Sequence, residues 1–111
     1  MIDKVKSTVS FLKEKGYEKP ELGIILGTGL GALTNHIEVF HEIPYDEIPN
    51  FPIATVEFHK GKLLYGKIEG KTIIAMSGRF HYYEGYSMEE VVFPVRVMQQ
   101  LGIKRLLISN A

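Results

Sequence analysis

The apolar residues near the N-terminus recur at helical spacing. After Asp3 come Val5, Val9 and Leu12, which are four and three residues apart, so they would share one face of a helix. Asp3 is a residue type that caps helices, and Gly16 is of the type that ends them. The pattern therefore predicts a first helix that Asp3 caps and that ends near Gly16.

Short apolar runs then predict strands. Residues 21–26 form one such run. Residues 40–52 contain three prolines, which remove backbone donors, and they predict an irregular loop. Residues 55–75 have strand character, and within this region residues 62–68 and 71–76 flank the Glu-Gly pair at 69–70, which predicts a hairpin.

A second helix and a last strand complete the pattern. Ser87 and Glu90 have the spacing of a capping box, and Gly102 is suited to the helix end. Pro94 predicts a kink or a division of this helix into two pieces. Residues 104–109 read as a buried strand. The order of helices and strands predicts an α/β class. Because a parallel strand needs cover on both faces, the chain reads as a truncated single domain, residues 1–111.

Composition narrows the class of protein. The 111 residues are 45% hydrophobic and 23% charged, with a net charge of zero, which is typical of one soluble domain without a broad nucleic-acid or membrane surface. The chain has no cysteine, which excludes thiolate chemistry and cysteine-ligated zinc. We expect a cytoplasmic protein, because the charged N-terminus lacks a signal peptide and no apolar run is long enough to span a membrane.

The first strand leads into a glycine turn, "ILGTGLGA". Gly27, Gly29 and Ala32 match a dinucleotide-binding pattern, but that pattern needs an acidic strand end about 20 residues further on. Glu47 lies instead in the proline-rich region, which disfavours a nicotinamide cofactor. The turn is also suited to phosphate, since its backbone N–H groups and the Thr28 hydroxyl can donate. A tight turn without a ligand remains an equal alternative.

The segment "SGRFHYYEGY" carries the strongest chemical signal. It follows an apolar strand, where open α/β sheets usually place their ligands. Arg79 and His81 can donate to one oxyanion, and Glu84 can orient the imidazole of His81. Neighbouring tyrosines offer ring edges and hydroxyls to a sugar. The segment favours an anion site beside a sugar over the alternative of a solvated loop.

The remaining histidines carry less information. His59 is either another donor or a strand-edge residue, and the local sequence leaves both interpretations open. His36 and His41 have no polar neighbours in sequence and read as surface residues. No histidine–carboxylate spacing indicates a metal site, and no serine lies on a nucleophile elbow.

Together these motifs identify a family. The chain resembles the N-terminal part of the trimeric purine nucleoside phosphorylases, through "GTGLG", "IPNFP", "TVEFHKGKLLYG", "GRFHYYEGY", "FPVRVMQQLG" and "LLISNA" in the family's order. The resemblance implies the N-terminal part of a phosphorylase-type domain, with a mixed central sheet flanked by helices. It also implies a pentosyltransferase of purine salvage that forms a homotrimer.

The implied reaction is phosphorolysis. Inorganic phosphate, the co-substrate, attacks the anomeric carbon of a purine (deoxy)ribonucleoside, giving the free base and (deoxy)ribose 1-phosphate, without metal or organic cofactor. The resemblance implies that phosphate is bound by the backbone N–H of Ala111 and by side chains from three segments. It implies that Tyr83 contacts the ribose and that Glu84 supports His81. The side chains implied to bind phosphate are those of Thr28, His59, Arg79 and His81.

Departures from the family bear on this assignment. Phe58 replaces the glycine common before the loop histidine, and Ser77 replaces a common glutamine. Family members are more than twice as long, and the residues that recognise the base are absent, so the choice between 6-oxopurines and adenosine stays open. The alternative to a phosphorylase is a catalytically silent fragment that binds phosphate or self-associates.

Overall fold

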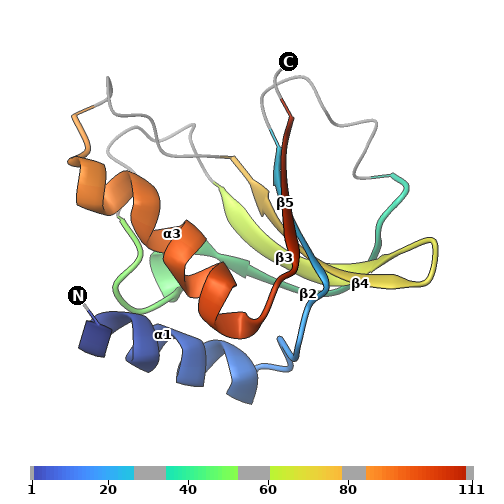
Figure 1. Cartoon of the computed structure of the whole chain (residues 1–111), viewed down its shortest axis with the longest axis horizontal. Coiled ribbons are helices and arrows are strands. Elements are labelled where there is room, and N and C mark those ends of the chain that lie inside the picture. Colours follow the sequence, from blue (N-terminus) through green and yellow to red (C-terminus); the bar gives the residue numbers. More distant parts are fainter. Residues whose placement is uncertain (1, 27–34, 53–60, 79–84, 110–111) are drawn as a thin grey trace.

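A computed structural model describes residues 2–26, 35–52, 61–78 and 85–109. They form two α-helices, five strands and one 3₁₀ helix (Figure 1). In chain order these are α1 (Ile2–Glu14), β1 (Leu22–Leu26), β2 (Glu38–Pro44), η1 (Tyr45–Glu47), β3 (Lys62–Ile68), β4 (Lys71–Ser77), α3 (Met88–Leu101) and β5 (Arg105–Ser109). This order confirms the predicted α/β class.

The five strands form one mixed sheet in the order β2-β3-β4-β1-β5. β1 lies between β4 and β5 and is parallel to both, whereas β3 is antiparallel to β2 and β4. The hairpin predicted around the Glu-Gly pair is confirmed as β3 and β4. Glu69 and Gly70 both have positive φ angles, +48° and +82°, as tight hairpin turns require.

Both faces of the sheet carry apolar clusters, because side chains alternate along each strand. Ile25 and Ile74 face a cluster that includes the buried residues of α1, α3 and η1. Ile24 and Ile73 belong to a second cluster on the other face. α1 and α3 lie side by side on the first face (Figure 1), and no other α-helix is present among the described residues.

The second helix follows its predicted boundaries. Ser87 accepts a hydrogen bond from the Glu90 amide, and the Glu90 side chain accepts one from the Ser87 amide, so the capping box is confirmed. Gly102 ends the helix in the left-handed conformation, with φ of +103°. Of the two effects predicted for Pro94, division of the helix is wrong, since α3 continues through Pro94, which is buried in the core. A kink at Pro94 stays a prediction.

Asp3 lies inside the first turn of α1, which begins at Ile2, so the prediction that Asp3 caps this helix is wrong. Its carboxylate still stabilises the helix, because a negative charge in the first turn opposes the helix dipole. Lys13 in the last turn complements the other end in the same way.

The proline-rich region is not an irregular loop, and this prediction is wrong for much of its length. Its first part is the strand β2, and η1 follows directly. Pro44 fits because β2 is an edge strand, where a missing N–H costs no interior ladder bond, and because it stands at the last position of that strand. The other two prolines of the region lie beyond η1.

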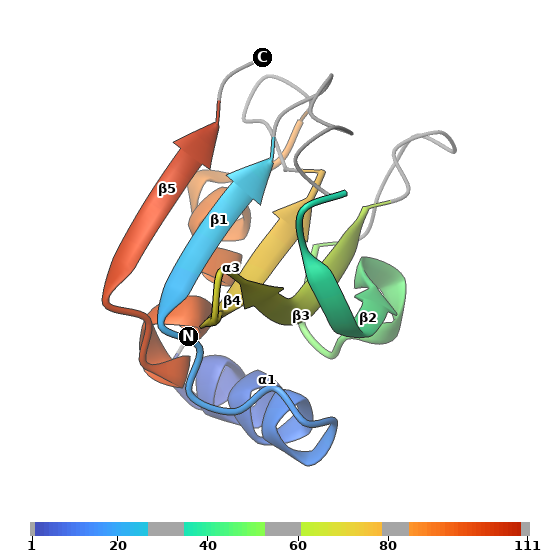
Figure 2. The same cartoon turned by 90° about the vertical axis from the view of Figure 1, so that its right-hand side faces the viewer.

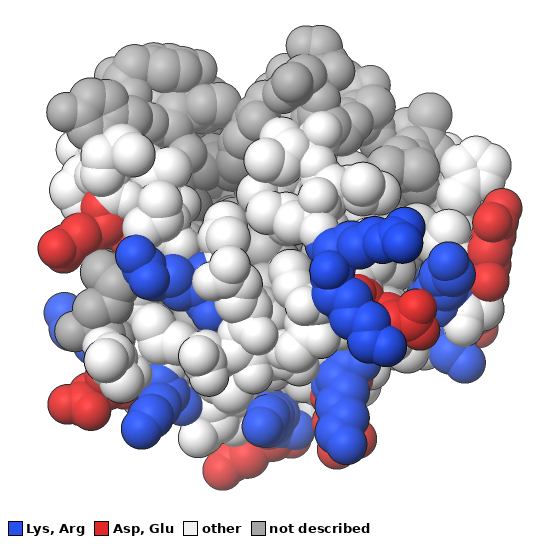
Figure 3. Space-filling model, viewed as in Figure 1, with Lys and Arg blue, Asp and Glu red and all other residues white. Residues whose placement is uncertain are grey.

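The surface agrees with the balanced composition. Basic and acidic side chains are interspersed over the face in Figure 3 rather than gathered by sign. His36 and His41 are exposed, as predicted, although His41 stacks on Tyr17 with ring centroids 5.9 Å apart. None of the described helices has the length and hydrophobicity needed to cross a membrane.

β5 is the opposite edge strand of the sheet and exposes apolar side chains, so the prediction that this last strand is buried is wrong. Among the described strands it pairs only with β1. Leu107 and Ile108 are 53% and 56% exposed, respectively. Adjacent residues of a strand point to opposite faces, so both faces of β5 carry an exposed apolar group.

Candidate active site

The candidate site lies at one edge of the sheet, where several strand ends meet. The last residue of β1, Leu26, pairs with the last residues of β4 and β5, which are Ser77 and Ser109. The first residue of β3, Lys62, also pairs with Ser77. In Figure 2 the arrows of β1, β4 and β5 all point to this edge. Carboxyl ends of parallel strands are the usual ligand positions of open α/β sheets.

Every predicted site residue lies close in sequence to this row of strand ends. Thr28 comes two positions after Leu26, and Arg79 directly follows Gly78. Ala111 comes two positions after Ser109. The predicted site residues themselves, together with Phe58, lie outside the described residues, and their roles remain predictions: Thr28, His59, Arg79, His81, Tyr83, Glu84 and Ala111.

Tyr45 of η1 reaches the same edge from the face of the sheet that α1 and α3 cover. Its hydroxyl donates a hydrogen bond of 2.5 Å to the backbone oxygen of Gly78. Its own backbone N–H donates to the oxygen of Gly61 at 3.1 Å. Burial raises the pKa of the Tyr45 hydroxyl far above its usual value, so the group remains a proton donor across the neutral range.

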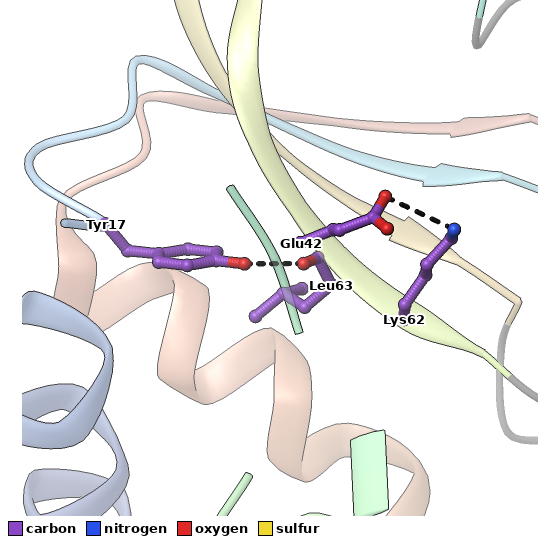
Figure 4. A network of polar contacts seen from close by, with 4 residues as sticks. All are labelled: Tyr17, Glu42, Lys62 and Leu63. Carbon is purple, nitrogen blue, oxygen red and sulfur yellow. Dashed lines mark hydrogen bonds and ion pairs between the residues drawn. The ribbon is translucent and has the colours of Figure 1, made fainter. Parts of the chain in front are cut away.

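An ion pair joins the start of β3 to β2. Lys62 forms an ion pair of 3.2 Å with Glu42 of β2, and both side chains are about half exposed. Figure 4 shows this pair next to the Tyr17 hydroxyl, which donates to the backbone oxygen of Leu63 at 2.6 Å. Burial, and then the negative charge of Glu42, raise the pKa of Tyr17. Lys62 is therefore a cation at the site edge that already has a partner.

The described residues offer little support for two other kinds of site. No group of three or more His, Asp or Glu side chains there could hold a metal ion. A hollow of about 140 Å³ lies between α1 and α3, and none of the strand-end residues lines it. Its lining residues are Ile2, Val5, Lys6, Arg96, Gln99 and Gln100.

Sequence reasoning missed Tyr45 and Lys62. Tyr45 stood in a region predicted to be irregular, and its partners are backbone carbonyls far away in the sequence, which leave no signal in residue types. Lys62 opens a predicted strand, so its place at the end of the hairpin, beside Ser77, could have indicated a position at the site edge.

The fold is that of an α/β protein whose parallel strands end together at one edge, which is the usual ligand position of such sheets. The family model described as the phosphorylase superfamily matches residues 21–111. The chain belongs to this superfamily.

Relatives in bacteria agree with the family assignment. Over 107 residues the chain is 54% identical to purine nucleoside phosphorylase 1 of Geobacillus stearothermophilus. The aligned region covers 96% of this chain and 39% of that protein. The chain is 50% identical over 111 residues to purine nucleoside phosphorylase 1 of Bacillus subtilis (strain 168), covering 100% of this chain and 41% of the relative. The resemblance to purine nucleoside phosphorylases is thus confirmed, and the chain spans about two fifths of the length of these relatives.

Solved structures give the same result. The purine nucleoside phosphorylase of Schistosoma mansoni in complex with acetate superposes with a TM-score of 0.91 at 44% identity, over 99% of this chain and 40% of that one. Isoform 2 from the same organism, in complex with cytosine and ribose-1-phosphate, gives a TM-score of 0.88 at 45% identity, over 96% and 37% of the two chains. The mixed sheet of this chain therefore matches the part of these structures that the chain covers.

Proposed function

We propose that this chain supplies the phosphate-binding part of a purine nucleoside phosphorylase. The reaction is the phosphorolysis of purine (deoxy)ribonucleosides to the free base and (deoxy)ribose 1-phosphate. Inorganic phosphate is the co-substrate, with no metal or organic cofactor. The complete enzyme is a cytoplasmic homotrimer of purine salvage, a pentosyltransferase that binds neither nucleic acid nor membrane.

One observation supports the proposal most strongly. The last residues of β1, β4 and β5 stand in one row, and each is followed within two positions by a residue predicted to bind phosphate. Successive Cα atoms are about 3.8 Å apart, so two residues of chain span less than about 8 Å. Three segments distant in sequence can therefore reach one anion.

The proposed chemistry follows from this arrangement. A phosphate oxygen forms a bond to the anomeric carbon while the bond from that carbon to the base nitrogen breaks, and the bonding electron pair leaves with the base. Arg79 and His81 hold the phosphate, with Thr28, His59 and the amide of Ala111 as further donors. Tyr83 contacts the ribose and Glu84 orients His81. Fixed donors around the phosphate align it for attack without costly reorganisation.

The experiment measures whether phosphate stabilises the chain and whether the chain cleaves inosine. Phosphate at about 100 times its dissociation constant should raise the free energy of unfolding by about 2.7 kcal/mol. This gain should disappear in Arg79→Ala, which removes the bidentate donor. It should persist in Arg96→Ala, which removes the same charge from an exposed position of α3 that lines the hollow beside α1 rather than the strand ends.

Release of hypoxanthine from inosine is then followed with and without phosphate. Phosphate-dependent release would support the full activity in this chain. Stabilisation without release would favour the alternative, a catalytically silent phosphate-binding fragment. Absence of stabilisation by phosphate would contradict the proposal.

A further inference from the structure

Three buried tyrosines donate hydrogen bonds to backbone carbonyls distant in sequence. Tyr17 bonds to Leu63, Tyr65 bonds to Glu18, and Tyr45 bonds to Gly78. Glu18 precedes β1, so the Tyr65 bond lies toward the end of the sheet where β1 begins. The Tyr45 bond lies at the other end, where β4 finishes.

The Tyr45 ring is held firmly. It is only 4% exposed and packs against Phe51, with ring centroids 5.6 Å apart. A methyl group on Gly61 would lie 2.2 Å from Cε2 of Tyr45, so the ring rests directly on the glycine backbone. The backbone N–H of Tyr45 also donates to the oxygen of Gly61, so main chain and ring both hold these two residues together.

Tyr45 therefore touches two neighbouring strand ends at once. Gly61 precedes β3 and Gly78 follows β4, and a Cβ on Gly78 would be 3.3 Å from the Cα of Gly61. Gly78 has a φ of +101°, a conformation that other residues rarely adopt. A carbonyl on so permissive a residue would otherwise be free to turn, and the tyrosine hydroxyl fixes its direction.

We infer that Tyr45 is a positioning residue for phosphate: its hydroxyl fixes the Gly78 carbonyl and its ring fixes Gly61. Gly78 directly precedes Arg79, and Gly61 follows His59 by two positions. The inference rests on the proposed function, since it assigns those two residues to phosphate. Catalytic geometry tolerates little displacement, because a shift of about 1 Å can cost on the order of 100-fold in rate.

Tyr45→Phe tests the inference because it keeps the ring and removes only the donor. The dissociation constant for inorganic phosphate, measured by calorimetric titration of the 111-residue chain, should rise about tenfold, as loss of one hydrogen bond allows. Tyr65→Phe is the matched control, since it removes a bond of the same 2.5 Å length toward the other end of the sheet. It should lower stability comparably and leave phosphate affinity unchanged.

Hydrogen exchange separates this inference from the proposed function. In Tyr45→Phe, the amides of Gly61, Lys62 and Gly78 should exchange about tenfold faster than in the wild type, whereas Tyr65→Phe should not change them. Wild-type phosphate affinity in Tyr45→Phe, or an equal loss in both variants, would overturn the inference. If the wild type binds no phosphate, the proposed function fails, and unchanged exchange at Gly78 would still overturn the role of Tyr45.

Discussion

At the scale of single residues, Gly61 shows how closely the backbone is packed beneath the candidate site. A Cβ at this position would lie 2.2 Å from Cε2 of Tyr45 and 2.9 Å from the backbone oxygen of Ser77. The oxygen belongs to a strand and cannot move aside as a flexible side chain would. Glycine is therefore required at position 61 for space.

Gly61→Ala should lower the free energy of unfolding by about 3 kcal/mol, because overpacking forces the ring of Tyr45 or the strand end to shift. Urea denaturation measures the change. Gly70→Ala is the control: nothing lies within 4 Å of its Cβ, so only the strain of a positive φ remains, about 1 kcal/mol. A loss in Gly61→Ala no larger than that of the control would contradict this account.

The residues of the site were predictable only in part. Arg79 and His81 stand out from residue type and from their place after a strand, and resemblance to a family adds roles for the other site residues. Tyr45 was not predictable, because a tyrosine in a proline-rich region gives no indication that its hydroxyl meets a carbonyl 33 residues away. Its importance comes from tertiary contact alone.

At the scale of elements, the residue pattern predicted those helices and strands whose formation depends on residues close together in the chain. The hairpin β3–β4 follows from its turn residues, and α3 follows from its capping box and terminal glycine. β2 was missed because it lies at the sheet edge and six of its seven residues are exposed, so its sequence shows no buried alternation. Its pairing with β3, rather than its own pattern, makes it a strand.

Ser87→Ala should lower the free energy of unfolding by about 1 kcal/mol, since it leaves the Glu90 amide without its 3.1 Å acceptor. Thermal or urea unfolding followed by circular dichroism measures the loss. Ser10→Ala, at an exposed position within α1, is the matched control and should change stability by less than about 0.5 kcal/mol. Equal effects at the two serines would show that the capping box does not stabilise α3.

At the scale of the whole molecule, the central fact is that three parallel strands end in one row. Their order in the sheet, β4-β1-β5, differs from their order in the chain, so no local pattern predicts which ends become neighbours. The α/β class was predictable from the order of helices and strands, but this convergence required the assembled sheet. It turns segments separated by dozens of residues into candidates for one binding site.

The most direct test of this claim is to map phosphate binding on the chain by the chemical shifts of its backbone amides. We predict that the largest changes on adding inorganic phosphate occur at Leu26, Gly78 and Ser109 and in the residues that follow them. Lys6 and Arg96 line the hollow between α1 and α3, and these two cationic side chains could also attract an anion. Largest changes there, with none at the three strand ends, would contradict the account.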